Sequence, residues 1–150
     1  MADVVDKNEP EIPLKDLKLM FSRQDSFMRA LGADIIDIGP GTATVRMAIS
    51  KDHLNFNGSC HGGCIFALAD CAFGVSSNTH GVMAAGIDAH ITYQAAAYVG
   101  EILTARSREI SRSRKIATYR IEVESENNGL IASFTGTVYI IGIPHSPEAR

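Results

Sequence analysis

The chain has 150 residues, of which 45% are hydrophobic and 21% charged, and its net charge is −3. This composition is typical of a globular domain with a core of its own, so we expect one domain over residues 1–150. The negative charge argues against a dedicated nucleic-acid-binding protein, which would be basic. Asp70 interrupts the best apolar run, so no stretch reaches the roughly 18 residues of a membrane span.

Two features indicate the cellular compartment. Met1–Asp6 is acidic and lacks the apolar core of a secretory signal. The three cysteines form no C-x-x-C pair, so we expect free thiols in a cytoplasmic protein. Residues 1–12 are polar and contain Pro10, and we expect them to form a flexible arm.

The first predicted elements are two short helices. Apolar residues recur with helical spacing from Leu14 to Phe21. A second helix is predicted between a capping residue, Asp25 or Ser26, and a stop at Gly32.

After these helices the hydrophobic period changes to two. Apolar and polar residues alternate over 42–49, 85–93, 117–124 and 132–140. Further strands are expected over 34–38 and 101–110, and the sequence Asn127-Asn128-Gly129 predicts a hairpin. Such alternation is typical of antiparallel strands with one buried face.

The long helix candidate is Gly62–His80, which is apolar on nearly every side. We therefore expect it to be buried all round. A sheet of five or six antiparallel strands must then curl around this helix to cover it. The predicted fold class is α+β, with the helix as the filling of the sheet.

Asp70 is the first candidate for chemistry, because it is the only charged residue between Gly62 and Thr79. An ionised carboxylate in apolar surroundings costs several kcal/mol unless it is paired or hydrogen-bonded. Such a residue can act as a general base or a nucleophile. The alternative is a buried aspartate that backbone or hydroxyl donors satisfy.

Gly62 and Gly63 open the predicted helix. The first amides of a helix lack internal partners and carry the positive end of its dipole, and glycine lets a ligand oxygen approach them closely. The pair is therefore a candidate oxyanion hole. The alternative is that the two glycines only turn the chain into the helix.

The spacing of these candidates has a consequence for the assembly. Gly62 and Asp70 are eight residues apart, which places them about 12 Å apart along one helix. They cannot both reach one carbonyl group. If they cooperate, the aspartate comes from a second copy, and a two-fold dimer with antiparallel central helices forms two shared active sites.

Other polar residues are weaker candidates. Asn55 can orient water or substrate, or can be an ordinary turn asparagine. His61 can donate to substrate or play a structural part at the helix start. Cys60, His61 and Cys64 fit no standard zinc spacing, so no metal is expected. Basic residues gather near 106–120; they can hold phosphates or form a solvated hairpin.

Two segments resemble the PaaI-type branch of the hotdog-fold acyl-CoA thioesterases. They are Asn55-Phe56-Asn57-Gly58-Ser59-Cys60-His61-Gly62-Gly63 and Phe66-Ala67-Leu68-Ala69-Asp70-Cys71-Ala72-Phe73. The resemblance covers roughly residues 27–141. It implies a hotdog fold, dimers that commonly pair into tetramers, and hydrolysis of acyl-CoA esters, often phenylacetyl-CoA. It implies no cofactor, since coenzyme A is part of the substrate.

The resemblance also implies roles for particular residues. Asp70 matches the catalytic acidic residue, which activates water or attacks directly. Gly62 matches the glycine that polarises the thioester carbonyl, and Asn55 an asparagine that helps place the nucleophile or the acyl group. Substrate contacts are expected from His61, Gly63 and Ser77, and contacts with the coenzyme A phosphates from Arg112, Arg114 and Lys115. The chain departs from the family at Gln94-Ala95-Ala96-Ala97, where a Leu-Arg-Pro-Ala segment is usual, and at Gly74, where some relatives carry a hydroxyl.

Three alternatives stay open. The acyl group can be of medium or long chain instead of small and aromatic. A hotdog protein can also bind acyl-CoA without turning it over. A hydratase or dehydratase would need His61 in an acid–base pair.

Overall fold

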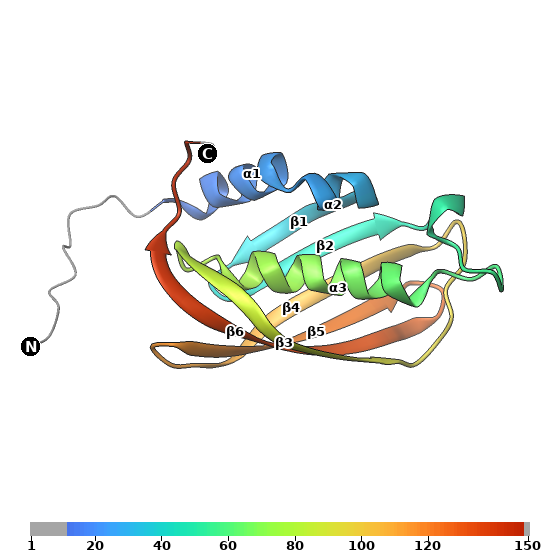
Figure 1. The fold of residues 1–150 in the computed structure, drawn as a ribbon. Coiled ribbons are helices and arrows are strands. Elements are labelled where there is room, and N and C mark those ends of the chain that lie inside the picture. The colour runs from blue at the N-terminus through green and yellow to red at the C-terminus, as the bar shows by residue number, and fades with distance from the viewer. Residues whose placement is uncertain (1–11, 149–150) are drawn as a thin grey trace, which may run out of the picture.

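The computed structural model describes residues 12–148, so most of the arm predicted over 1–12 lies outside the described residues. Six antiparallel strands form one curved sheet in the order β1-β2-β4-β5-β6-β3, and α3 lies against its concave side (Figure 1). The predicted α+β class and hotdog arrangement are confirmed. The elements are α1 Leu14–Gln24, α2 Ser26–Leu31, β1 Ala33–Gly39, β2 Thr42–Ala48, η1 Lys51–His53, α3 Gly62–Ser77, β3 Val82–Tyr93, β4 Ile102–Arg112, β5 Ile116–Ser125 and β6 Gly129–Pro144.

The two N-terminal helices form where the sequence predicts them. The Asp25 carboxylate accepts a hydrogen bond of 2.8 Å from the backbone N–H of Met28, which caps α2. Gly32 ends α2 in the left-handed region, with φ of 78°. Both helices pack on β1, and α2 also contacts α3.

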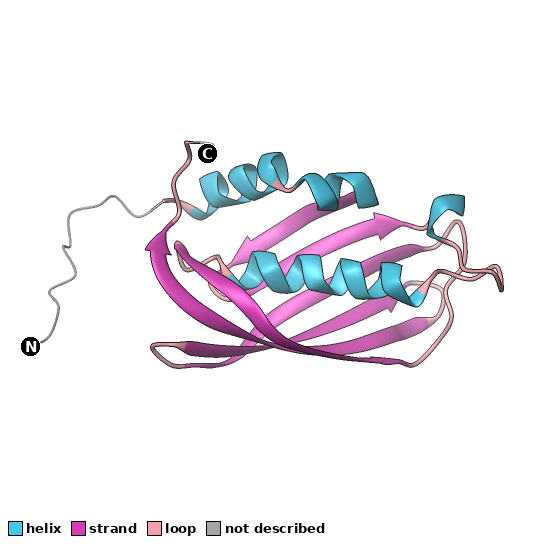
Figure 2. Ribbon diagram, in the orientation of Figure 1, coloured by secondary structure: helices cyan, strands magenta, loops and turns pink. Residues whose placement is uncertain are grey.

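The core lies between α3 and the strands that curve beneath it (Figure 2). The Phe73 ring of α3 packs against Tyr119 of β5 and Phe134 of β6, with ring centroids 5.9 Å and 5.6 Å apart. The alternation predicted for β5 is confirmed, because its inward residues from Ala117 to Val123 are fully buried. Apolar contacts between α3 and the sheet therefore hold the helix in place.

The prediction that the long helix is buried all round is wrong. α3 ends at Ser77, three residues early, and leaves an open face along Gly63, Asp70 and Gly74, with Ala67 half-buried between them. These positions recur every three or four residues, so they share one side of the helix. One sheet curls around only part of a helix, and this side stays uncovered in the single chain.

The buried face predicted for residues 85–93 is also wrong. β3 is an edge strand that pairs only with β6, and most of its residues are exposed. Ile87 is 60% exposed and Tyr93 48%. The pairing register shifts between Gly86 and Asp88, which breaks the strict alternation.

Among the helices of residues 12–148, none is both long and apolar enough to cross a membrane.

Candidate active site

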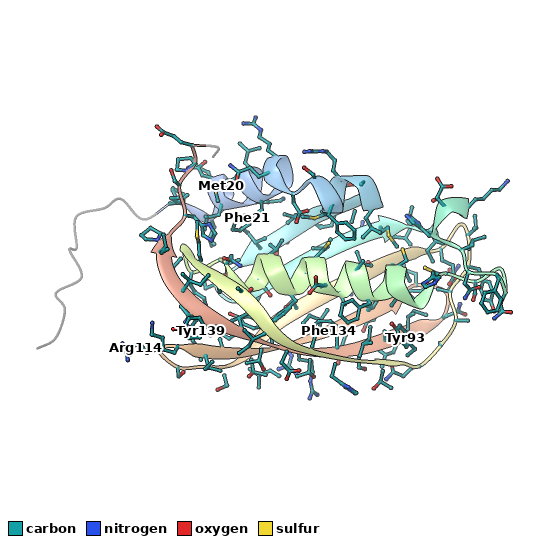
Figure 3. All side chains as sticks on the ribbon, viewed as in Figure 1. Met20, Phe21, Tyr93, Arg114, Phe134 and Tyr139 are labelled. Atoms are coloured by element: carbon teal, nitrogen blue, oxygen red, sulfur yellow. The ribbon has the colours of Figure 1, made fainter. Side chains whose placement is uncertain are left out.

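Asp70 lies halfway along α3 on its open face, and not in the core as expected. It lines an open pocket of about 610 Å³ between α3 and the junction of α1 with α2. Phe21, Phe27 and Asp25 form the far wall of this pocket, and Phe21 points from α1 toward α3 (Figure 3). Within residues 12–148 no cation pairs with the Asp70 carboxylate and no donor hydrogen-bonds to it.

The surroundings of Asp70 favour its protonated form. The pocket walls remove part of the hydration of its carboxyl group, and this desolvation is the main reason that the pKa of Asp70 is raised. The negative charge of Asp25 across the pocket raises it further. A carboxylate with a raised pKa is a better base at neutral pH than an ordinary aspartate.

Gly62 begins α3, and the two amides of the glycine pair differ in their partners. The Gly63 N–H donates to Nδ1 of His61 at 2.8 Å, so His61 is the N-cap of the helix. The Gly62 N–H has no acceptor among the described residues. Gly62 thus offers the free donor that the sequence predicts, whereas the donor of Gly63 is used within the chain.

Tyr93 contacts this end of the helix and is not among the site residues that the sequence predicts. Its hydroxyl donates a hydrogen bond of 2.9 Å to the Gly62 carbonyl. Gly62, Tyr93 and the unusual segment Gln94–Ala96 line a second pocket of about 370 Å³. The position of Tyr93 at the end of a predicted strand gives no hint of this contact.

The two pockets lie at different points along α3. Asp70 faces the first pocket and Gly62 the second, and no residue lines both. The eight-residue spacing places them about 12 Å apart along the axis. Within one chain, therefore, the structure does not bring the candidate base and the candidate oxyanion donor together.

The Asn55 side chain makes hydrogen bonds within its own loop. Its side-chain oxygen accepts from the N–H groups of Asn57 and Ser59, at 2.9 Å and 3.2 Å. Its amide nitrogen donates to the Ser59 hydroxyl at 3.1 Å. This pattern is that of a turn asparagine, the second of the two interpretations that the sequence leaves open.

Ser77 is placed away from both pockets. Its side chain is 2% exposed, and its hydroxyl donates to the Gly74 carbonyl one turn earlier in α3. The structure therefore gives no support in the single chain to the expected contact between Ser77 and substrate.

The predicted phosphate-binding residues lie at the turn between β4 and β5. Arg112 pairs with Glu109, with 3.5 Å between Nη1 and Oε2. The Lys115 ammonium lies 5.4 Å from the centre of the Tyr139 ring. Arg114 and Tyr93 mark opposite ends of the molecule, so one chain does not bring these cations to Gly62 (Figure 3).

The cysteines near the site do not form a metal centre. No group of three or more His, Cys, Asp or Glu side chains in the part of the chain described here is arranged to hold a metal ion. Burial, with the charges of Asp25 and Asp70, raises the pKa of Cys71 to about 12. The expectation that the protein needs no metal or cofactor stays a prediction.

Comparison with known proteins defines the family. The thioesterase superfamily model matches residues 57–132, which include both Gly62 and Asp70. A putative esterase of Archaeoglobus fulgidus is 44% identical over 127 residues, covering 85% of this chain and 82% of the relative. The acyl-coenzyme A thioesterase PaaI of Escherichia coli is 34% identical over 125 residues, covering 83% and 89%.

A solved structure of similar fold supports the same family. The structure of the E. coli PaaI protein from the phenylacetic acid degradation operon has 31% sequence identity and a TM-score of 0.83, covering 88% of this chain and 95% of that one. The chain belongs to the thioesterase superfamily, as a hotdog-fold thioester hydrolase of the PaaI type.

Proposed function

We propose that this protein hydrolyses an acyl-CoA with a small aromatic acyl group, at two equivalent sites shared between two copies of the chain. Each site combines Asp70 of one copy with the free Gly62 N–H of the other. The observation that carries the proposal is that neither group has a partner among residues 12–148, while both lie on one helix too far apart to serve one carbonyl. Two antiparallel copies of α3 would place each group opposite the other.

The exposed edge of the sheet supports this pairing. β3 is twelve residues long and carries exposed apolar side chains such as Ile87. A long unprotected edge strand invites pairing with another chain. Antiparallel pairing of β3 with its copy would join the two sheets and set both α3 helices on the same side. The pairing of two such dimers into a tetramer stays a prediction from the resemblance.

The chemistry needs two contributions from the protein. The Gly62 N–H would donate to the thioester oxygen, whose negative charge grows in the transition state. Asp70 would act as general base, removing a proton from water as its oxygen attacks the carbonyl carbon. As the carbon–sulfur bond of the tetrahedral intermediate breaks, the leaving sulfur would take this proton from Asp70, so that coenzyme A departs as the thiol, the free acid remains and Asp70 is again ionised. The raised pKa of Asp70 favours the role of base.

The pocket beside Asp70 indicates the acyl group. Phe21, Phe27 and Val75 give it an apolar wall, which suits a flat ring better than a polar group. The E. coli relative comes from a phenylacetic acid degradation operon, which points to the same class of substrate. We therefore expect phenylacetyl-CoA to be a better substrate than acetyl-CoA.

Two further groups of predicted site residues have a part in this proposal. Arg112, Arg114 and Lys115 would hold the coenzyme A phosphates, since they form the basic turn between β4 and β5. Asn55 would act indirectly, by keeping the loop before α3 in shape.

The substitution Asp70→Asn tests the function. We expect kcat for phenylacetyl-CoA to fall by about 10²- to 10⁴-fold, as for the loss of a general base, in a thiol-release assay. The melting temperature should not fall, because the carboxylate has no partner within residues 12–148 and its raised pKa means that its ionised form opposes folding at neutral pH. Parental turnover in this variant would refute the assignment.

The same assay separates the alternatives. Faster hydrolysis of long-chain than of aromatic esters would reassign the acyl group. Tight binding of acyl-CoA without any thiol release would mean that the protein is a binding module.

A further inference from the structure

The peptide group that joins Gly62 to Gly63 is held at both ends. Tyr93 Oη donates to its carbonyl oxygen at 2.9 Å, and His61 Nδ1 accepts from its N–H at 2.8 Å. Both partners come from outside the helix: Tyr93 ends β3, and His61 precedes α3. The side chain of the preceding residue and one from 31 positions away therefore fix one peptide plane.

The preceding peptide group is fixed as well. The carbonyl of His61 accepts from the N–H groups of Cys64 and Ile65, at 2.9 Å and 3.1 Å. In a trans peptide the C=O and N–H point in opposite directions. Because the His61 carbonyl points into the helix, the Gly62 N–H must point outward from its end.

This anchoring matters because two consecutive glycines are the most flexible start that a helix can have. An oxyanion donor is effective only when its direction is set before the reaction, since reorientation during the reaction costs free energy. The backbone hydrogen bonds to the His61 carbonyl set the direction of the Gly62 N–H, and the contacts of Tyr93 and His61 hold the next peptide group in place.

The fit between Tyr93 and Gly62 is close. A Cβ atom added at Gly62 would lie 3.3 Å from both Cζ and Oη of Tyr93, so the ring rests on the glycine itself. The end of β3 is held by the N–H groups of Gln94 and Ala95, which both donate to Ile131. Desolvation raises the pKa of Tyr93, which keeps its hydroxyl protonated and able to donate.

We propose that Tyr93 is a positioning residue of the thioesterase reaction. Together with His61 it fixes the Gly62–Gly63 peptide, which limits rotation at Gly62 and so keeps the N–H of the preceding His61–Gly62 peptide aimed at the thioester oxygen. This inference rests on the proposed function of Gly62. Tyr93 acts through the glycine and takes no proton from the substrate.

Tyr93→Phe tests the inference, because it removes the hydroxyl and keeps the ring. We expect kcat for phenylacetyl-CoA to fall by about tenfold, less than the 10²- to 10³-fold that follows loss of an oxyanion donor. KM should change by less than about twofold, since the ester still binds in the same place. Tyr98→Phe is the matched control, because Tyr98 is similarly exposed and its hydroxyl makes no hydrogen bond within the described residues; only its backbone N–H donates, to Glu101.

A spectroscopic measurement separates positioning from general damage. In the slow Asp70→Asn background, infrared difference spectra of phenylacetyl-CoA labelled with ¹³C at its carbonyl report the hydrogen bond to the thioester oxygen. We expect the bound carbonyl band to lie at lower frequency than the free one, and Tyr93→Phe to reduce this shift. An unchanged band, or unchanged kcat in the single variant, would overturn the role of Tyr93.

The two proposals fail in different ways. If Asp70→Asn hydrolyses the labelled ester at the parental rate, the proposed function is wrong whatever Tyr93 does. If Asp70→Asn is inactive while Tyr93→Phe changes neither kcat nor the band, only the positioning role is wrong.

Discussion

Asp25, which lies between α1 and α2, and Asp70 of α3 face one pocket and have different effects. Asp25 caps α2 by accepting from the Met28 N–H at 2.8 Å. Asp70 has no such partner within residues 12–148, and its pKa is raised first by desolvation and then by the charge of Asp25. Asp25 therefore stabilises α2 as its N-cap and also raises the pKa of the candidate base Asp70.

The substitution Asp25→Asn separates these two effects. Asparagine caps a helix about as well as aspartate, so stability should hardly change. Removal of the negative charge should lower the raised pKa of Asp70, because one of its two causes disappears. The ionised base is the active form, so the acidic limb of the kcat/KM profile should move to lower pH.

The measurement is a pH–rate profile of thiol release for the parent and the variant. Asp25→Ala is the control: it also removes the charge and should shift the limb equally, but loss of the cap should lower the free energy of unfolding by about 1 kcal/mol. An acidic limb that stays in place in both variants would show that the limb does not report Asp70.

At the scale of elements, local patterns predicted most of the fold. The cap predicted at Asp25 or Ser26, the stop at Gly32, the alternation of β5 and the hairpin at Asn127-Asn128-Gly129 are set by neighbouring residues. The structure confirms them and shows that Asp25 is the cap. The open face of α3 and the exposure of β3 depend on where a sheet ends. The alternation of apolar and polar residues does not show whether a strand lies at the edge of its sheet, because an edge strand can have the same alternation as a central one.

In the candidate site, too, the sequence predicts what neighbouring residues determine and does not predict contacts between distant ones. The sequence identifies Asp70 and Gly62, because a lone carboxylate and a glycine pair stand out in an apolar helix. It does not identify Tyr93, whose contact with Gly62 joins residues 31 positions apart in the chain. It identifies Asn55 as a candidate but does not decide between a substrate contact and the hydrogen bonds that this side chain makes within its own loop.

The packing of α3 on the sheet depends on glycines beneath Phe73. A Cβ atom at Gly136 of β6 would lie 2.7 Å from Cζ of Phe73 and 2.9 Å from both Cε atoms. We expect Gly136→Ala to lower the free energy of unfolding by about 1–3 kcal/mol, because overpacking forces the ring to move. Denaturant titration measures this loss.

A second substitution checks the cause. Phe73→Leu removes the ring atoms that meet the new methyl group, so Gly136→Ala should cost less in that background than in the parent. Equal costs in both backgrounds would mean that Gly136 is needed for its backbone and not for the space above it.

At the scale of the whole molecule, three features of residues 12–148 have no partner within that part of the chain. They are the edge of β3, the open face of α3 and the free N–H of Gly62. One two-fold axis would satisfy all three, since it would pair β3 with its copy and place the α3 helices antiparallel. Because separate interfaces would otherwise be needed, we favour the symmetric dimer.

A mixture of two inactive variants tests whether the sites are shared. Asp70→Asn removes the base, and Gly62→Pro removes the N–H donor. Proline suits the first position of a helix, and His61 already has the extended conformation, with φ of −60° and ψ of 134°, that a residue before proline prefers. Each variant alone should be inactive as a homodimer.

In a mixed dimer, one site would combine the intact Gly62 of the Asp70→Asn chain with the intact Asp70 of the Gly62→Pro chain. Random pairing makes about half of all dimers mixed, with one working site of two, so unfolding and refolding an equal mixture should restore about a quarter of the parental activity. If both groups act within one chain, every site carries a defect and the mixture stays inactive, which would end the proposal of a shared site.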